Sequence, residues 1–93
     1  MAKPDLMRER IAAFRWPRGG VVVMKASRGY TLYSARTGEP VARFRPTGDG
    51  DRVQVLWWRR GAWGASGPFG IATMPLDRAL DYVASDPTFW ISA

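Results

Sequence analysis

The sequence contains neither cysteine nor histidine. Without cysteine the chain forms no disulfide, presents no thiolate nucleophile and builds no cysteine-based zinc site. Without histidine it lacks the side chain that most often serves as a general base or metal ligand near neutral pH. Together the two absences exclude most of the familiar hydrolase arrangements.

Acidic residues are also scarce, with 8 against 14 lysines and arginines, so the net charge is +6. Residues 1–60 carry a net charge of +8, whereas residues 61–93 carry −2. This asymmetry is compatible with a basic face that binds a polyanion. Twelve of the 14 basic residues are arginine. Together with abundant alanine, glycine and tryptophan, this is also the composition that a GC-rich genome encodes, so genome bias is an equally good explanation.

Apolar runs of membrane-spanning length are absent, and the N-terminal residues 1–7 contain no apolar signal segment. We therefore expect a cytoplasmic protein that does not enter a membrane. The chain has 93 residues, of which 46% are hydrophobic. A chain of this size is expected to form a single domain over residues 1–93 that needs nearly every large apolar side chain for its core.

The segment Val53–Trp63 holds three of the five tryptophans and predicts the central strand of a small sheet. Strand alternation divides its side chains between an apolar face (Val53, Val55, Trp57) and a mixed face (Gln54, Leu56, Trp58, Arg60). A tight hairpin at Gly61–Ala62 is expected to return Trp63 toward Trp57 or Trp58.

Three β-branched or aromatic runs precede this segment and predict further strands at residues 21–25, 30–35 and 41–45. In the third run, alternation predicts that Ala42 and Phe44 are buried and that Arg43 and Arg45 are exposed. Turn residues separate all four runs, which favours an antiparallel meander.

Two amphipathic patterns predict helices at the ends of the chain. Residues 4–14 place Met7, Ile11 and Phe14 on one face. A second helix is expected to start at residues 73–75, to end before Pro87, and to bury Leu76, Ala79, Leu80 and Val83. The glycine-rich residues 64–70 predict a short edge segment and a loop, and the apolar residues 88–91 predict a tail that docks on the domain.

The predicted fold class is therefore α+β: an N-terminal helix, a four- to five-stranded antiparallel meander sheet, and a C-terminal helix packed on one face.

The run from Glu39 to Arg45, the Trp58–Trp63 segment, and the Leu76–Leu80 and Asp86-Pro87 motifs occur in an order that resembles a family of small, mostly bacterial proteins. That family is known as a domain of unknown function, and the resemblance covers roughly residues 39–90. Its members tend to have a histidine where Gly64 follows Trp63 here, so any activity that used the histidine is not expected. The resemblance implies the fold and a bacterial cytosolic setting, and it implies no mechanism.

The first functional hypothesis is that the mixed face binds single-stranded RNA or DNA. Arginines would hold the phosphates while an aromatic ring stacks on a base. The candidate residues are Tyr33, Arg43, Arg45, Trp58 and Arg60.

The second hypothesis is a protein-interaction module or homodimer that uses the same face, with Leu56, Trp58 and Trp90 as anchors, because tryptophan and arginine are enriched at interface hot spots. The third is an enzyme. Asp49 and Asp51 share a turn, and Asp77 and Asp81 share an exposed helix face, but neither pair has a base or a complete metal-binding pattern beside it. We therefore expect a non-enzymatic protein without catalytic residues, metal or cofactor.

Overall fold

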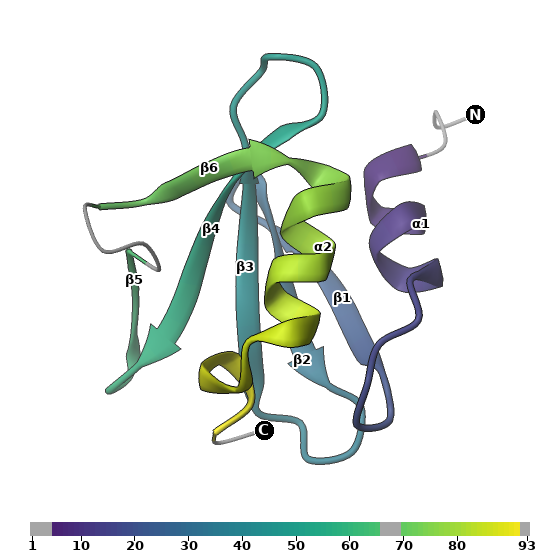
Figure 1. The fold of residues 1–93 in the computed structure, drawn as a ribbon, viewed down its shortest axis with the longest axis vertical. Coiled ribbons are helices and arrows are strands. Elements are labelled where there is room, and N and C mark those ends of the chain that lie inside the picture. Colours follow the sequence, from purple (N-terminus) through teal and green to yellow (C-terminus); the bar gives the residue numbers. More distant parts are fainter. Residues whose placement is uncertain (1–4, 66–69, 92–93) are drawn as a thin grey trace.

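The computed structural model describes residues 5–65 and 70–91, and these form an α+β fold in which a six-stranded sheet is flanked in sequence by two helices (Figure 1). The predicted fold class is confirmed. In chain order the elements are α1 (Leu6–Ala13), β1 (Val21–Ala26), β2 (Gly29–Ser34), β3 (Pro40–Pro46), β4 (Arg52–Arg59), β5 (Ala62–Ala65), β6 (Ala72–Pro75), α2 (Leu76–Ser85) and the short 3₁₀ helix η1 (Pro87–Trp90).

The sheet is antiparallel and centred on β4, in the order β1-β2-β3-β4-β5. One edge of β4 pairs with β3, and the other is divided between β5, which pairs with residues 56–59, and β6, which pairs with residues 52–55. The prediction of a central strand here is confirmed, although the strand ends at Arg59. The sixth strand was not expected.

Two hairpins turn on two residues that both have positive φ, as type I′ turns require. These residues are Ser27 and Arg28 between β1 and β2, with φ of 50° and 63°, and Arg60 and Gly61 between β4 and β5, with φ of 53° and 78°. The second turn therefore lies one residue before the predicted Gly61–Ala62. As a result, the side chains of Arg28 and Arg60 lie at the tips of hairpins.

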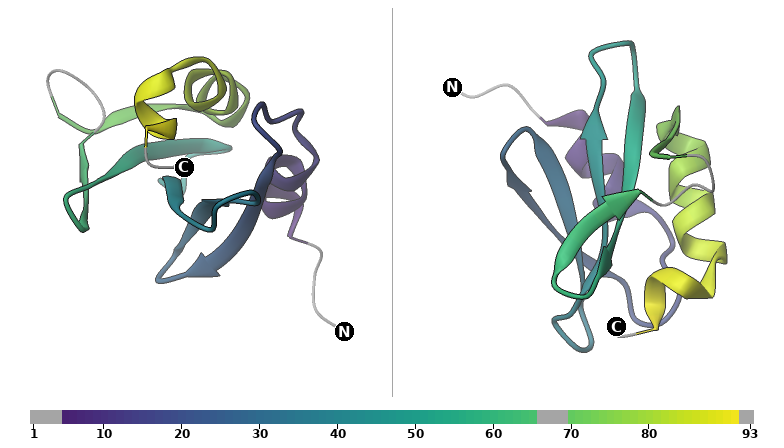
Figure 2. Two further views of the ribbon diagram at one scale, coloured as in Figure 1. Left: turned by 90° about the horizontal axis from the view of Figure 1, so that it is seen from below. Right: turned by 90° about the vertical axis from the view of Figure 1, so that its left-hand side faces the viewer.

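Both helices pack on the concave side of the curved sheet (Figures 1 and 2). Phe44, Val53 and Val55 face them and are fully buried, as alternation predicted. The same core contains Ile11 from α1 and the whole predicted stripe of α2, so that stripe is confirmed. Trp57 was predicted to lie in the core but is only half-buried, because it lies near the end of β4 where a cavity opens beside it.

The helix boundaries differ from the predicted ones. Asp5 caps α1 with its side chain, and the helix ends at Ala13, while residue 4 lies outside the described residues. Residues 73–75 do not begin α2, because they pair with the free half-edge of β4 as part of β6, and Pro75 takes the N-cap position.

The C-terminal tail docks as predicted. Phe89 and Trp90 of η1 are buried, and the Trp90 indole N–H donates to the carbonyl of Val83 at 2.9 Å. Ile91, directly after η1, is 80% exposed. The predicted loop after β5 falls on residues 66–69, outside the described residues.

Within the described parts of the chain, no helix combines the length and apolar character needed to cross a bilayer.

Candidate nucleic-acid interface

The face of the sheet opposite the helices is called the outer face below. Neither α1, α2 nor η1 covers it (Figure 2). Its strand residues alternate with those of the core. They are Val22, Met24, Thr31, Tyr33, Arg43, Arg45, Arg52, Gln54, Leu56, Trp58, Trp63 and Ala65.

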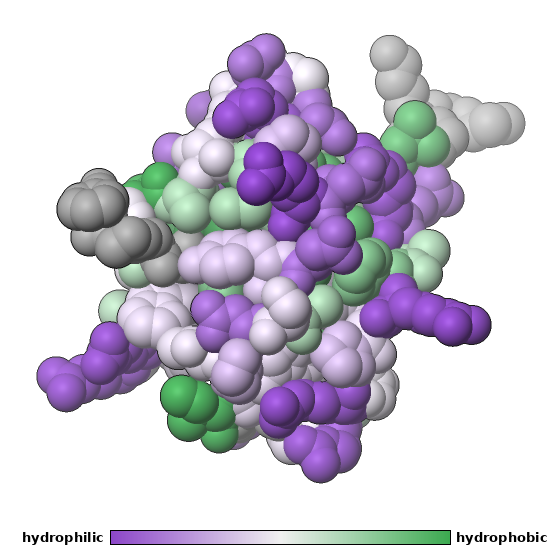
Figure 3. Space-filling view, viewed as in Figure 1, coloured by the Kyte–Doolittle hydropathy of each residue, from purple (hydrophilic) through white to green (hydrophobic). Residues whose placement is uncertain are grey.

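Charge separates sharply between the strands and the rest of the molecule. None of the six strands contains an acidic residue, and together they carry five basic ones, of which Arg43, Arg45 and Arg52 belong to the outer face. The acidic side chains belong to the helices, the caps and the turns. On the helix-bearing side, hydrophilic side chains gather over the β3–β4 turn and over α1 (Figure 3). The outer face therefore carries three arginines and no carboxylate from its own strands, a charge pattern that favours a polyanion.

Arg43 lies on the outer face as predicted, but it is half-buried rather than exposed. Its guanidinium donates to Thr31 Oγ1 at 2.8 Å and to the carbonyls of Ala26 and Ser27 at 2.8 and 3.0 Å. A Cβ at position 29 would lie 2.6 Å from Arg43 Nη2, so Gly29 leaves room for this contact. Arg43 thus uses three of its five N–H donors to tie β3 to the β1–β2 hairpin.

Three other arginines present free donors at this face or its end. Arg45 is exposed and uses only its Nε–H, which donates to Gln54 Oε1 at 2.8 Å. Arg60 is exposed at its hairpin tip, and no hydrogen bond or ion pair joins it to the described residues. Arg52 is also exposed on the outer face. Arg52 is not among the predicted residues, because the predicted strand begins at Val53, although alternation with Gln54 places it on this face.

Aromatic side chains gather at one end of the outer face. Trp58 is 37% exposed and makes an edge-to-face contact with Trp63, with ring centroids 5.0 Å apart. Tyr33 is half-buried opposite Pro40, the end of β3 that runs beside Trp58. The expected return of Trp63 to Trp58 is confirmed. Four of the five predicted residues, Tyr33, Arg43, Arg45 and Trp58, thus share the outer face. Arg60 does not belong to it, because β4 ends at Arg59 and Arg60 lies in the hairpin turn beside the aromatic end.

Two of the three anchors expected for a protein interface do not belong to an exposed surface. Leu56 lies in the cross-strand row between Arg43 and Ala65 and is only 6% exposed. Trp90 is 3% exposed and lies in the core with the helices. The anchors therefore do not form one patch, because strand alternation describes direction but not how far neighbouring side chains cover a residue.

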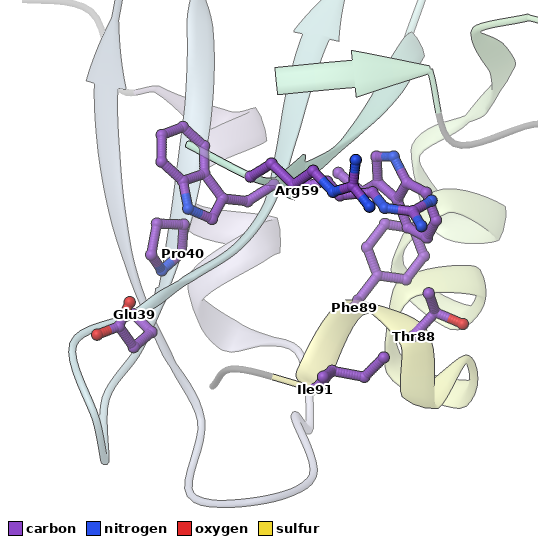
Figure 4. A pocket seen from close by; sticks show the side chains of 9 residues that line it. Glu39, Pro40, Arg59, Thr88, Phe89 and Ile91 are labelled. Atoms are coloured by element: carbon purple, nitrogen blue, oxygen red, sulfur yellow. The ribbon is translucent and has the colours of Figure 1, made fainter. Parts of the chain in front are cut away.

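A cavity of about 330 Å³ opens where β4 ends, between the sheet and η1. Arg59 reaches from β4 toward Thr88 and Phe89, while Glu39 and Pro40 lie on the other side (Figure 4). The Arg59 guanidinium lies over the Trp57 ring, 5.1 Å from its centroid. This cavity was not predicted from the sequence, although two tryptophans followed by two arginines, residues 57–60, are among the residues that line it.

Arg10 connects one carboxylate from each of the two pairs considered for catalysis. Asp51 and Asp77 both bind Arg10, and the hydrogen bond with Asp77 is the largest cause of the raised pKa of that guanidinium. The single cation binds both carboxylates and offsets one of their two negative charges. Among residues 5–65 and 70–91, no group of three or more metal-ligating acidic side chains comes together.

Comparison with known proteins finds no matching family model, no matching curated protein and no matching solved structure. The resemblance over residues 39–90 therefore stays a prediction.

Proposed function

We propose that the protein binds single-stranded RNA or DNA through the outer face, as a binding protein rather than an enzyme. The observation that carries the proposal is the absence of acidic residues from all six strands, on a face that no helix covers and that exposes Trp58 with Arg45 and Arg52. Polyanions favour such a surface because each neutralised phosphate releases condensed counterions.

The arginines and the aromatic side chains of the face would make different contacts with the strand. Arg45, Arg52 and Arg60 would contact phosphates, because their terminal N–H groups are free among the described residues. Trp58 would stack on a base, an interaction worth about 1–3 kcal/mol. Trp63 supports Trp58 through the edge-to-face contact, and Tyr33 offers a second ring nearby. Arg43 would act indirectly, by holding the hairpin beside the face.

Fluorescence anisotropy of a short labelled oligonucleotide tests the proposal. We expect micromolar protein to bind at about 50 mM salt with little sequence preference. Trp58→Ala should weaken binding by roughly tenfold, which corresponds to one stacked base. Leu6→Ala is the matched control, because Leu6 is also an exposed apolar residue but lies on α1. The absence of binding at this salt concentration, or equal losses in the two variants, would refute the proposal.

A homodimer or protein partner is the second candidate, and one observation favours it. Val22 and Met24 on the edge strand β1 are 51% and 53% exposed, and they extend the apolar part of the outer face. Light scattering coupled to gel filtration over a range of protein concentrations would reveal a dimer that dissociates on dilution. A molar mass that stays at the monomer value over this concentration range would rule out the homodimer.

A further inference from the structure

The cavity beside η1 is connected to the outer face through one residue, Trp58, which lines both. Trp57 and Phe89 add apolar ring surface to its walls. Its volume of about 330 Å³ lies at the lower end of the range of small-molecule sites, which is roughly 300–1,000 Å³. The cavity therefore suits a single small ligand rather than a length of polymer.

The cationic side of this cavity consists of Arg59 and Arg60. Both side chains are exposed, and neither guanidinium forms an ion pair or hydrogen bond with any residue that the structure describes. The Arg59 guanidinium makes a cation–π contact with the Trp57 ring, and this contact uses none of its N–H donors. Two such groups at adjacent positions match the acceptor oxygens of a phosphate.

The opposite side is formed by Glu39 and Pro40 at the start of β3 (Figure 4). Glu39 is exposed at this rim, and its carboxylate accepts hydrogen bonds from hydroxyl or amino groups rather than binding an anion. A ligand that contacts the arginines, the aromatic rings and Glu39 must therefore combine a phosphate, a flat ring and hydrogen-bond donors.

We propose that this cavity binds one nucleotide, with its phosphate at Arg59 and Arg60, its base against the aromatic walls, and a ribose hydroxyl or an exocyclic amine at Glu39. The choice of ligand class rests on the proposed binding of nucleic acid by the outer face. The nucleotide is either a free nucleoside monophosphate or one unit of a bound strand, because both have the same recognised chemistry.

Isothermal titration calorimetry with adenosine monophosphate tests the site, with adenosine and inorganic phosphate as separate titrants. We expect the monophosphate to bind more tightly than either fragment. Arg59→Ala should weaken its binding at least about tenfold, the cost of losing charge-assisted hydrogen bonds. Arg78→Ala, an exposed arginine on α2, should leave it unchanged. No measurable binding at millimolar nucleotide, or binding that survives both Arg59→Ala and Glu39→Gln, would overturn the inference.

Competition separates the two sources of the nucleotide. If the site takes one unit of a strand, adenosine monophosphate will compete with the labelled oligonucleotide and Arg59→Ala will weaken both ligands. If it takes free nucleotides, Arg59→Ala will weaken the monophosphate and leave the affinity for the oligonucleotide unchanged. Arg45→Ala should affect only the oligonucleotide. Mononucleotide binding without oligonucleotide binding would refute the proposed function and support this site. Oligonucleotide binding without mononucleotide binding would support the proposed function and refute this site.

Discussion

Arg43 and Arg45 are two residues apart on β3 and point to the same face, yet their guanidinium groups differ in surroundings. Arg43 binds one side-chain oxygen and two backbone carbonyls, whereas Arg45 makes a single side-chain hydrogen bond. The carbonyls of Ala26 and Ser27 lie at the end of the β1–β2 hairpin, and Arg43 is their side-chain hydrogen-bond donor there. Arg43 is therefore expected to contribute to stability and Arg45 to remain available for a ligand.

Replacing each arginine with alanine tests this difference. Arg43→Ala should lower the free energy of unfolding by about 1–2 kcal/mol, because it removes charge-assisted hydrogen bonds from a half-buried site. Arg45→Ala should change it by less than about 0.5 kcal/mol. Urea denaturation followed by tryptophan fluorescence measures both values. Equal effects would show that the Arg43 contacts contribute nothing beyond those of an exposed arginine.

The faces of individual residues were predictable from the sequence, but their degree of burial was not. Alternation placed Arg43, Leu56 and Trp58 correctly on the mixed face. It did not indicate that Leu56 is covered or that Arg43 has three partners, because both depend on which residues of β2 and β5 lie opposite. Pairing partners are a property of the tertiary register, which one strand's pattern does not contain.

At the scale of the element, the N-cap residue Asp5 connects α1 to the sheet through a hydrogen bond with Tyr30. The Asp5 carboxylate accepts from the Arg8 backbone N–H at 3.0 Å and from the Tyr30 hydroxyl at 2.8 Å, and it lies 3.3 Å from Lys25 Nζ. Desolvation raises the pKa of Asp5, but the hydrogen bonds from Arg8, Tyr30 and Lys25 together outweigh it and lower the pKa below the ordinary 3.8. The folded state thus favours the charged carboxylate.

Because its pKa is lower in the folded state, Asp5 stabilises the fold above pH 3.8, and this contribution is lost as the pH falls through the lowered value. Asp5→Asn keeps an N-cap acceptor but removes the charge. The variant should be less stable than the natural protein by roughly 0.5–1 kcal/mol at neutral pH, and the difference should shrink toward zero near pH 2. Urea denaturation at the two pH values measures it, and a difference independent of pH would contradict the assignment.

The second helix shows which signals of an element are local. Its buried stripe follows from the spacing of four apolar residues, and the structure confirms all four. Its start was predicted too early, because nothing in residues 73–75 reveals that half of one edge of β4 is left open by the short β5. Residues 73–75 form a strand because this half of the β4 edge is unpaired in the folded sheet, and that pairing prevails over their local helix-start pattern.

Replacing one residue of that stripe with a charge should prevent folding. Leu80 is 4% exposed, so Leu80→Asp would bury an unpaired carboxylate, and we expect the circular dichroism spectrum to lose its cooperative thermal transition. Leu80→Ala should fold but lose about 2–5 kcal/mol of stability. Arg78→Asp introduces the same residue on the exposed side of α2 and should cost less than about 1 kcal/mol. A cooperative transition in Leu80→Asp near that of Arg78→Asp would show that the stripe is not essential.

At the scale of the whole molecule, the charge pattern acquires a meaning that the chain order alone did not reveal. The sequence shows a basic first part and a weakly acidic end, whereas the structure separates acid-free strands from helices and turns that hold the acidic residues. Residues that are distant in sequence are thereby brought into one sheet: Arg45 lies on β3, and Arg60 lies at the tip of the β4–β5 hairpin. The fold class followed from local patterns, while the cavity at η1 did not, because it forms only where β4 and the C-terminal tail meet.

This separation of charge predicts how salt affects the binding of single-stranded nucleic acid. If Arg45, Arg52 and Arg60 each neutralise one phosphate, the logarithm of the binding constant should fall with the logarithm of salt concentration with a slope of about −2. Replacing Arg45 and Arg52 together with alanine should flatten the slope by about 1.4 units.

Two controls separate charge from stacking in this experiment. Trp58→Ala should weaken binding at every salt concentration and leave the slope unchanged, because stacking releases no counterions. Arg78→Ala removes one positive charge from the helix-bearing side and should change neither the affinity at moderate salt nor the slope, because α2 lies on the other side of the sheet from the outer face. Anisotropy titrations of one labelled oligonucleotide at several salt concentrations give both quantities. If Arg78→Ala flattens the slope as much as the loss of an outer-face arginine does, binding responds to net charge alone and the outer face is not the site.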